Sequence, residues 1–159
     1  VGDVARRAGI GRVTVYRRIG HKPELVEAAI QSELQRVVEL IADAIAPLRS
    51  PAERLVEAFV IAVRTLRTHP LLQRLLQTEP EEVMPYLTQH VDPILALAGR
   101  FVAEQVYQPG GKYDPELVGE LLARLVQSLT LTPAGSIPGD DEHRLREFAR
   151  TYLTPLVGA

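Results

Sequence analysis

The stretch VGDVARRAGIGRVTVYRRIGHK, residues 1–22, decides the predicted fold of this chain. Its first part has helical apolar spacing and ends at Ala8-Gly9, where the glycine can adopt the left-handed conformation that terminates a helix and turns the chain. A second short helix is predicted to begin at Gly11, with Val13, Val15, Tyr16 and Ile19 on its apolar side. Two short helices joined by a glycine turn form a helix-turn-helix, a motif whose second helix enters the DNA major groove.

The outer side of this second helix is basic. The major groove is about 12 Å wide and admits one helix, which therefore needs polar and positively charged side chains facing the DNA. Residues 1–22 hold six basic side chains and one acidic, a net charge of +5, whereas the other 137 residues hold 12 basic and 19 acidic, a net charge of −7. A basic N-terminal segment on an otherwise acidic chain indicates that only this segment binds a polyanion. Runs of like charge are also found on solvated faces that bind nothing.

The same stretch resembles the signature of the TetR (tetracycline-repressor-like) family of transcriptional regulators. The matching positions are Val4, Ala5, Ala8, Gly9, Thr14, Val15, Tyr16, Lys22 and Leu25. The chain departs from the pattern at Ile19, where the family usually has Phe, and at Gly11, where Ser or Thr is common. Ile19 can still fill a core position, but Gly11 lacks a hydroxyl that would cap the helix and bind a phosphate.

The resemblance implies roles for individual side chains. Tyr16 and Lys22 would bind phosphates, Thr14 would bind phosphate or base, and Arg18 would be a general phosphate partner. The residues that would face base edges are Arg12, Val13 and Arg17, because an arginine reads guanine bidentately and a valine meets a thymine methyl. Two of these residues have a second interpretation, since Tyr16 also fits a core position and Arg18 also fits a solvated one.

The rest of the chain has the apolar spacing of helices throughout. Residues 23–46 form one helix about 36 Å long, ended by Pro47, and a capping box at Ser50 and Glu53 starts the next. Further helices are predicted over 71–77, from 80 through 87, from Asp92 as N-cap to about 107, over 115–131 and over 140–156. The predicted fold is all-α, with a helix-turn-helix DNA-binding domain and the start of a linker helix at 1–45 and a C-terminal ligand-binding and dimerisation domain at 46–159.

The resemblance also implies a helix that is absent from this sequence. TetR-like DNA-binding domains carry a helix ahead of the helix-turn-helix pair, which covers its core. The sequence begins after the place where that helix would lie. We therefore expect the natural chain to start earlier.

The C-terminal domain carries candidate surfaces for a second copy and for an effector. Because helix-turn-helix proteins usually bind two half-sites, we expect a homodimer built on the last two helices, although their apolar stripes also fit an internal core. The candidate dimer residues are Leu121, Leu125, Leu129, Phe148 and Tyr152.

A mostly apolar cavity with a few polar groups suits a small hydrophobic ligand. The candidate ligand residues are Phe59, Val63, Met84, Tyr86, His90 and Phe101. A histidine or tyrosine near a helix end is also commonly just solvated.

Other classes of function find little support in the sequence. The four histidines are scattered, with no HExxH motif, no glycine-rich phosphate loop and no Gly-x-Ser-x-Gly elbow, so an enzyme is not expected. No cysteine is present, and we expect no metal, no cofactor and no membrane partner. The chain has no secretory signal pattern, and we expect a cytoplasmic protein. A ligand-independent helical DNA-binding or protein-interaction module remains the alternative, and both repressors and activators use the same DNA contacts.

Two substitutions test the assignments in residues 1–22. Arg17→Ala is expected to weaken operator binding and relax its sequence preference by about 1–3 kcal/mol, because a base contact is lost. Lys22→Ala is expected to weaken binding to all DNA sequences equally, because a phosphate contact is lost. It should also reduce the steepness with which the logarithm of the binding constant falls with the logarithm of the salt concentration, by about 1. Gel-shift titrations at two salt concentrations on several sequences measure both effects, and unchanged affinity in both variants would refute the assignment.

Overall fold

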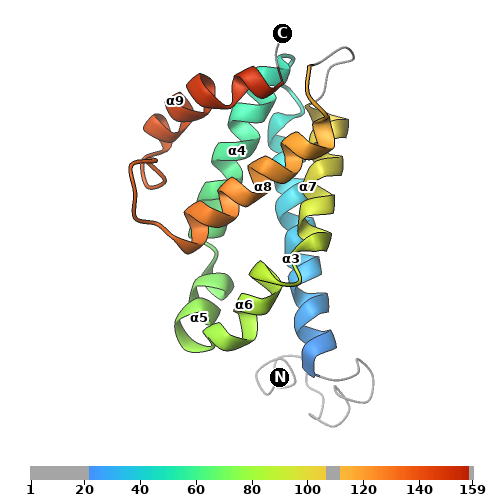
Figure 1. Ribbon diagram of the computed structural model, residues 1–159, viewed down its shortest axis with the longest axis vertical. Helices are drawn as coiled ribbons and strands as arrows, with labels where there is room; N and C mark the ends of the chain where they lie inside the picture. The colour runs from blue at the N-terminus through green and yellow to red at the C-terminus, as the bar shows by residue number, and fades with distance from the viewer. Residues whose placement is uncertain (1–21, 107–111, 158–159) are drawn as a thin grey trace. The chain divides into compact units, whose positions relative to one another are not determined.

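The computed structural model describes residues 22–106 and 112–157, with side chains from residue 27 onward. Figure 1 shows the helices, with a long loop between α8 and α9. They are α3 (Lys22–Ile45), α4 (Pro51–Arg67), α5 (Pro70–Thr78), α6 (Pro80–Thr88), α7 (Asp92–Gln105), α8 (Pro115–Leu131), α9 (Glu142–Tyr152) and a short 3-10 helix, η1 (Thr154–Leu156). Neither of the described ranges contains a strand, so the prediction of an all-α fold is confirmed.

The chain divides into two compact units, residues 1–36 and 37–159. The long helix α3 contributes residues to both units, and its residues 37–45 belong to the second. The predicted division into domains 1–45 and 46–159 stays a prediction.

Most helices start where the sequence offers a cap. Ser50, Asp114 and Asp141 precede α4, α8 and α9, and the side chain of each accepts a hydrogen bond from a backbone N–H of the first turn. Such a bond satisfies one of the donors that a helix start leaves unpaired. Proline is the first residue of α4, α5, α6 and α8, where its missing N–H costs nothing.

Two helix boundaries differ from the prediction. Asp92 was expected as an N-cap, but it is the first residue of α7, because Val91 already has helical backbone angles and takes the position ahead of it. The final helix was expected over 140–156, but α9 ends at Tyr152 and the chain continues as η1. Pro155 explains this end, since it has no N–H to continue the α-helical ladder.

Two apolar clusters fill the unit of residues 37–159. The larger is centred on α4, whose residues Leu55, Val56, Phe59, Val60 and Val63 are each at most 3% exposed. The smaller joins the end of α3 to α4. It is built on Val37, Ile41 and Ile45, with Leu48, Ala58 and Ile61 packed against them. Ala62, Leu66 and Phe101 border both clusters, so α4 and α7 connect the end of the long helix to the main core.

Two arginines of α4 hold the ends of neighbouring segments. Arg54 donates to the carbonyl oxygen of Leu48, just after α3, at 2.7 Å and to that of Gln105, the last residue of α7, at 2.9 Å. Arg67 donates to the carbonyl oxygen of Leu129 in α8 at 3.0 Å and forms an ion pair with Asp140. Carbonyls at helix ends have no partner within the helix, so these bonds both satisfy them and fix the helices in place.

The closest helix contact lies between α7 and α8, which share the most extensive contact in the unit. Gly99 in α7 faces Gly119 in α8. A Cβ atom added to Gly119 would lie 2.6 Å from both the carbonyl oxygen of Ala98 and the Cα atom of Gly99, nearer than real Cβ atoms come. A Cβ atom on Gly99 would lie 3.1 Å from the carbonyl oxygen of Glu116, a tight but less severe contact. The two glycines therefore allow the backbones to approach directly.

Gly119→Ala is expected to lower the free energy of unfolding by about 1–3 kcal/mol, because the two helices must move apart to admit the methyl group. In an open helical position the same change would stabilise by about 1 kcal/mol, since alanine is the better helix former. Gly99→Ala is the graded control and should cost less than Gly119→Ala. Urea denaturation measures both, and an unchanged or raised midpoint for Gly119→Ala would contradict the close approach.

Candidate functional site

The predicted DNA-binding residues lie almost entirely outside the described part of the chain. Arg12, Val13, Thr14, Tyr16, Arg17 and Arg18 fall in residues 1–21. Lys22 is the first residue of α3, and its side chain is likewise outside the described set. Their roles stay predictions.

The six candidate ligand residues fall into two groups. Phe59 and Val63 of α4 are 3% and 0% exposed and belong to the main core, and Phe101 of α7 is partly buried between the two clusters. Met84 and Tyr86 are partly buried in α6, and His90 is exposed in the turn that follows, where a break was predicted. The rings of Tyr86 and His90 are 6.1 Å apart between centroids. The first group packs within the protein's own core, whereas the second group belongs to neither core cluster.

The second group belongs to a helical hairpin that is only lightly anchored. α5 and α6 pack mainly against each other and lie side by side at one end of the C-terminal unit (Figure 1). α5 has no buried residue, although four of its nine residues are leucine, and α6 buries only Val83. Gln127 of α8 donates a hydrogen bond to the carbonyl oxygen of Leu87, and Gln73 donates one to that of Leu66 at 3.5 Å. Segments with few buried contacts open at low cost, so this hairpin is the element of the unit best suited to move.

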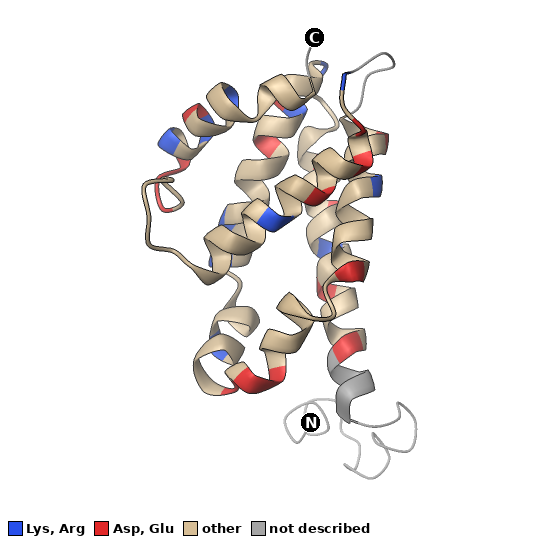
Figure 2. Ribbon diagram, viewed as in Figure 1, with Lys and Arg blue, Asp and Glu red and all other residues tan. Residues whose placement is uncertain are grey.

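Acidic residues gather where α5 meets α6, as Figure 2 shows. Glu79 precedes α6, and Glu81 and Glu82 lie in its first turn. Negative charge near a helix N-terminus is favoured by the helix dipole. The position of the Glu81-Glu82 pair therefore has a structural explanation. Asp140 and Asp141, the other acidic pair, likewise serve Arg67 and the start of α9.

The candidate dimer residues differ sharply in exposure. Leu121 of α8 and Tyr152 of α9 are 52% and 66% exposed, whereas Leu129 is 6% exposed and belongs to the chain's own core. Leu125 and Phe148 are partly buried and pack against that core. Leu117, one turn before Leu121, is 65% exposed. The candidate set omitted it, although its spacing of four from Leu121 placed it on the same side of the helix.

An aromatic row leads from the core to the surface of α9. The ring of Phe148 is 6.4 Å from that of Phe59 and 5.1 Å from that of Tyr152, measured between centroids. Both distances fall in the range of favourable aromatic contacts. Tyr152 is therefore held near the surface by Phe148, which is itself held by the core.

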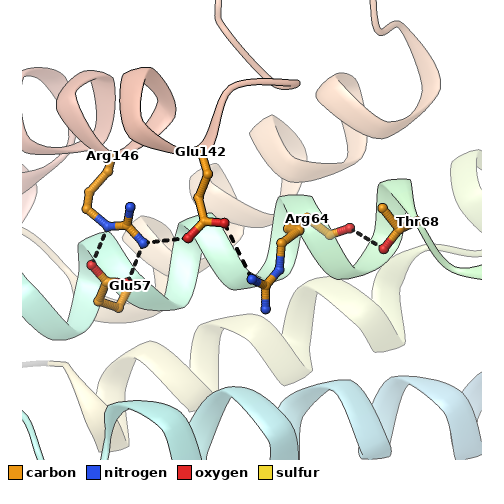
Figure 3. Close-up of polar contacts among 5 residues, drawn as sticks. All are labelled: Glu57, Arg64, Thr68, Glu142 and Arg146. Atoms are coloured by element: carbon orange, nitrogen blue, oxygen red, sulfur yellow. Dashed lines mark hydrogen bonds and ion pairs between the residues drawn. The ribbon is translucent and has the colours of Figure 1, made fainter.

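A network of ion pairs joins α9 to α4 (Figure 3). Arg146 donates to both carboxylate oxygens of Glu57, from Nε at 2.6 Å and from Nη2 at 3.0 Å, and Nη2 also donates to Glu142 at 2.8 Å. Glu142 in turn accepts from Arg64 at 3.4 Å. Hydrogen bonds to Glu57 and then Glu142 raise the pKa of Arg146, and the hydrogen bond from Arg146 is the main cause of the lowered pKa of Glu142. The sequence did not reveal this network, because Glu57 and Arg146 are 89 positions apart.

Among the described residues, no helix is long and apolar enough to cross a membrane. The same residues contain no group of three or more histidine, cysteine, aspartate or glutamate side chains that could hold a metal ion.

Comparison with known proteins points to a regulator. Over 157 residues the chain is 29% identical to two proteins, each named as an uncharacterized HTH-type transcriptional regulator, from Mycobacterium tuberculosis strains CDC 1551 / Oshkosh and ATCC 25618 / H37Rv. The alignment covers 99% of this chain and 74% of each relative. No family model and no solved structure matches the chain. The named relatives are regulators rather than enzymes, in agreement with the prediction from the sequence, and they support a helix-turn-helix transcriptional regulator while the TetR family itself stays a resemblance.

Proposed function

We propose that this chain is a ligand-responsive transcriptional repressor of the TetR type that binds a palindromic operator as a homodimer. The observation that carries the proposal is the basic helix-turn-helix pattern of residues 1–22, in a chain similar over 99% of its length to proteins named as HTH-type transcriptional regulators. In this proposal Arg12, Val13 and Arg17 read bases, and Tyr16 and Lys22 bind phosphates. The recognition helices of the two subunits would enter successive major grooves when they lie about 34–36 Å apart.

Exposed apolar side chains on the last two helices support the homodimer. Leu117 and Leu121 of α8 and Tyr152 of α9 are each more than half exposed. Leaving such side chains in water is unfavourable, and burying them against another apolar surface gains about 25 cal/mol per Å². A symmetric dimer presents the same patch from both subunits, so one row of leucines serves both sides of the interface.

Two features support the response to a ligand. The α5–α6 hairpin carries Met84, Tyr86 and, just beyond α6, His90, and it is lightly anchored. Phe101 of α7 packs against both core clusters, one of which contains Val37, Ile41 and Ile45 of α3. A small hydrophobic ligand that binds between α6 and the core would favour one position of α7 over another, and Phe101 would pass that preference to α3. The ligand would then shift the population toward dimers in which the distance between the two recognition helices does not match the operator.

Leu121→Glu is expected to raise the dimer dissociation constant roughly 30-fold or more, the effect of an interface hot spot, and to weaken operator binding with it. Leu71→Glu is the matched control, because Leu71 of α5 is 48% exposed and Leu121 of α8 is 52% exposed, and it introduces the same charge away from the proposed interface. Analytical ultracentrifugation and gel shifts measure the two effects. Equal dimerisation of both variants would exclude α8 from the interface.

An effector is expected to release the protein from DNA while stabilising its fold. Genome-wide capture of bound DNA gives the operator and its neighbouring genes, and the substrates of the encoded enzymes are then the compounds to test. A true effector at 100 times its Kd raises the free energy of unfolding by about 2.7 kcal/mol and lowers operator affinity in the same concentration range. A compound that stabilises the protein without changing its DNA affinity or the distance between the two recognition helices would count against the sensing mechanism.

A further inference from the structure

The apolar contact that holds α9 lies along one side of the helix. α9 packs mainly against α4 (Figure 1), through Leu145 and Ala149 and then Leu153 just beyond its end, which are 1%, 0% and 6% exposed. These three lie four positions apart, and Phe148 packs beside them, with its ring 6.4 Å from that of Phe59 of α4. Apolar contact of this kind holds two helices together but has little directionality. The exact rotation of α9 about its own axis is therefore left to directional contacts.

The ion pairs beside this apolar stripe are directional contacts. Arg146 follows Leu145 directly, and its planar guanidinium group makes two parallel hydrogen bonds to Glu57 on α4. Such a bidentate pair has one preferred geometry, unlike a single contact between point charges. The side chains of Arg146 and Glu57 are only 24% and 28% exposed, so solvent screens this pair less than the Arg64–Glu142 pair, whose side chains are 57% and 46% exposed. Glu142, one turn earlier on α9, also accepts a hydrogen bond from Arg146 and so helps to fix the guanidinium group.

We propose that the Glu57–Arg146 pair is a positioning device that sets the rotation of α9, so that Phe148 and Tyr152 present the correct face to a second copy of the chain. The inference rests on the proposed homodimer and names residues outside the interface that control it. Rotation of α9 would carry Tyr152 away from the surface on which Phe148 holds it. The pair therefore acts on assembly through the direction of these rings rather than by touching the partner.

A double-mutant cycle on the dimer dissociation constant tests the proposal. Arg146→Gln and Glu57→Gln, each in the full chain, are expected to raise the constant roughly 2- to 30-fold, the range in which positions outside a site act through packed neighbours. The double variant is expected to be no worse than the weaker-binding single variant, because both changes break one interaction. Arg150→Gln is the matched control, since Arg150 is an exposed arginine of the same helix outside this network, and it should change the constant less than twofold.

A distance measurement separates positioning from a general loss of stability. The chain has no cysteine, so His143→Cys gives a single site for a spin label on the side of α9 away from Phe148 and Tyr152, where the side chain is 80% exposed. In the otherwise unchanged dimer, the label-to-label distance distribution measured by electron paramagnetic resonance is expected to be narrow. Addition of Arg146→Gln should broaden it, even in samples concentrated enough to be fully dimeric. Arg146→Lys keeps the positive charge but cannot make two parallel hydrogen bonds to Glu57. It is the variant to use if Arg146→Gln fails to fold.

The outcomes distinguish the inference from the function on which it rests. A dimer that is weakened by Arg146→Gln but not by Arg150→Gln, with a broadened distance distribution, supports the positioning role. A dimer that tolerates Arg146→Gln and Glu57→Gln with unchanged distances, or that loses equal affinity in Arg150→Gln, overturns the inference and leaves the homodimer standing. A parent chain that stays monomeric at every concentration, with and without operator DNA, overturns the homodimer and the inference together.

Discussion

Five side chains of α4, from Leu55 to Val63, are almost fully withdrawn from water, and α7, α8, α9 and η1 all pack against this helix. Burial of one helical face gives a common surface against which the α7–α8 pair and the α9–η1 segment both pack. Each fully buried large apolar side chain contributes roughly 1.5–3 kcal/mol. Loss of this face would therefore release several helices together, and every candidate surface in the unit depends on it.

The polar residues of α4 work at the edges of the same face. Arg54 and Arg67 bond carbonyl oxygens of the chain just after α3 and of α7 and α8, and Glu57 and Arg64 hold α9. An apolar face alone permits neighbouring helices to slide and roll, because dispersion and the hydrophobic effect have little directionality. Hydrogen bonds from forked guanidinium groups have a preferred direction. Apolar burial thus supplies the cohesion of the unit, and arginine contacts supply its alignment.

The proposed function assigns movement to the hairpin that α4 does not hold, and assembly to apolar side chains that α8 and α9 leave exposed. The α5–α6 hairpin buries only Val83, while α8 and α9 leave Leu117, Leu121 and Tyr152 more than half exposed. A regulator that responds to a ligand needs an element that opens at low cost and a surface reserved for its partner. Phe101, which packs against both clusters, joins the main core to the end of α3.

The sequence by itself determined the all-α class and nearly all helix positions, because caps, prolines and 3.6-residue periodicity are local properties of the chain. It also determined the basic pattern of residues 1–22, on which the regulator prediction rests. Periodicity states which side of a helix is apolar but not what covers that side. Only the tertiary structure turned Leu129 inward and Leu121 outward on one stripe, packed Phe59 and Val63 into the core, and left Met84 and Tyr86 in a loose hairpin. The same holds for the contact of Gly119 with Gly99 and for the Glu57–Arg146 pair, since each joins side chains or backbones that are distant in sequence and meet only after several helices have packed.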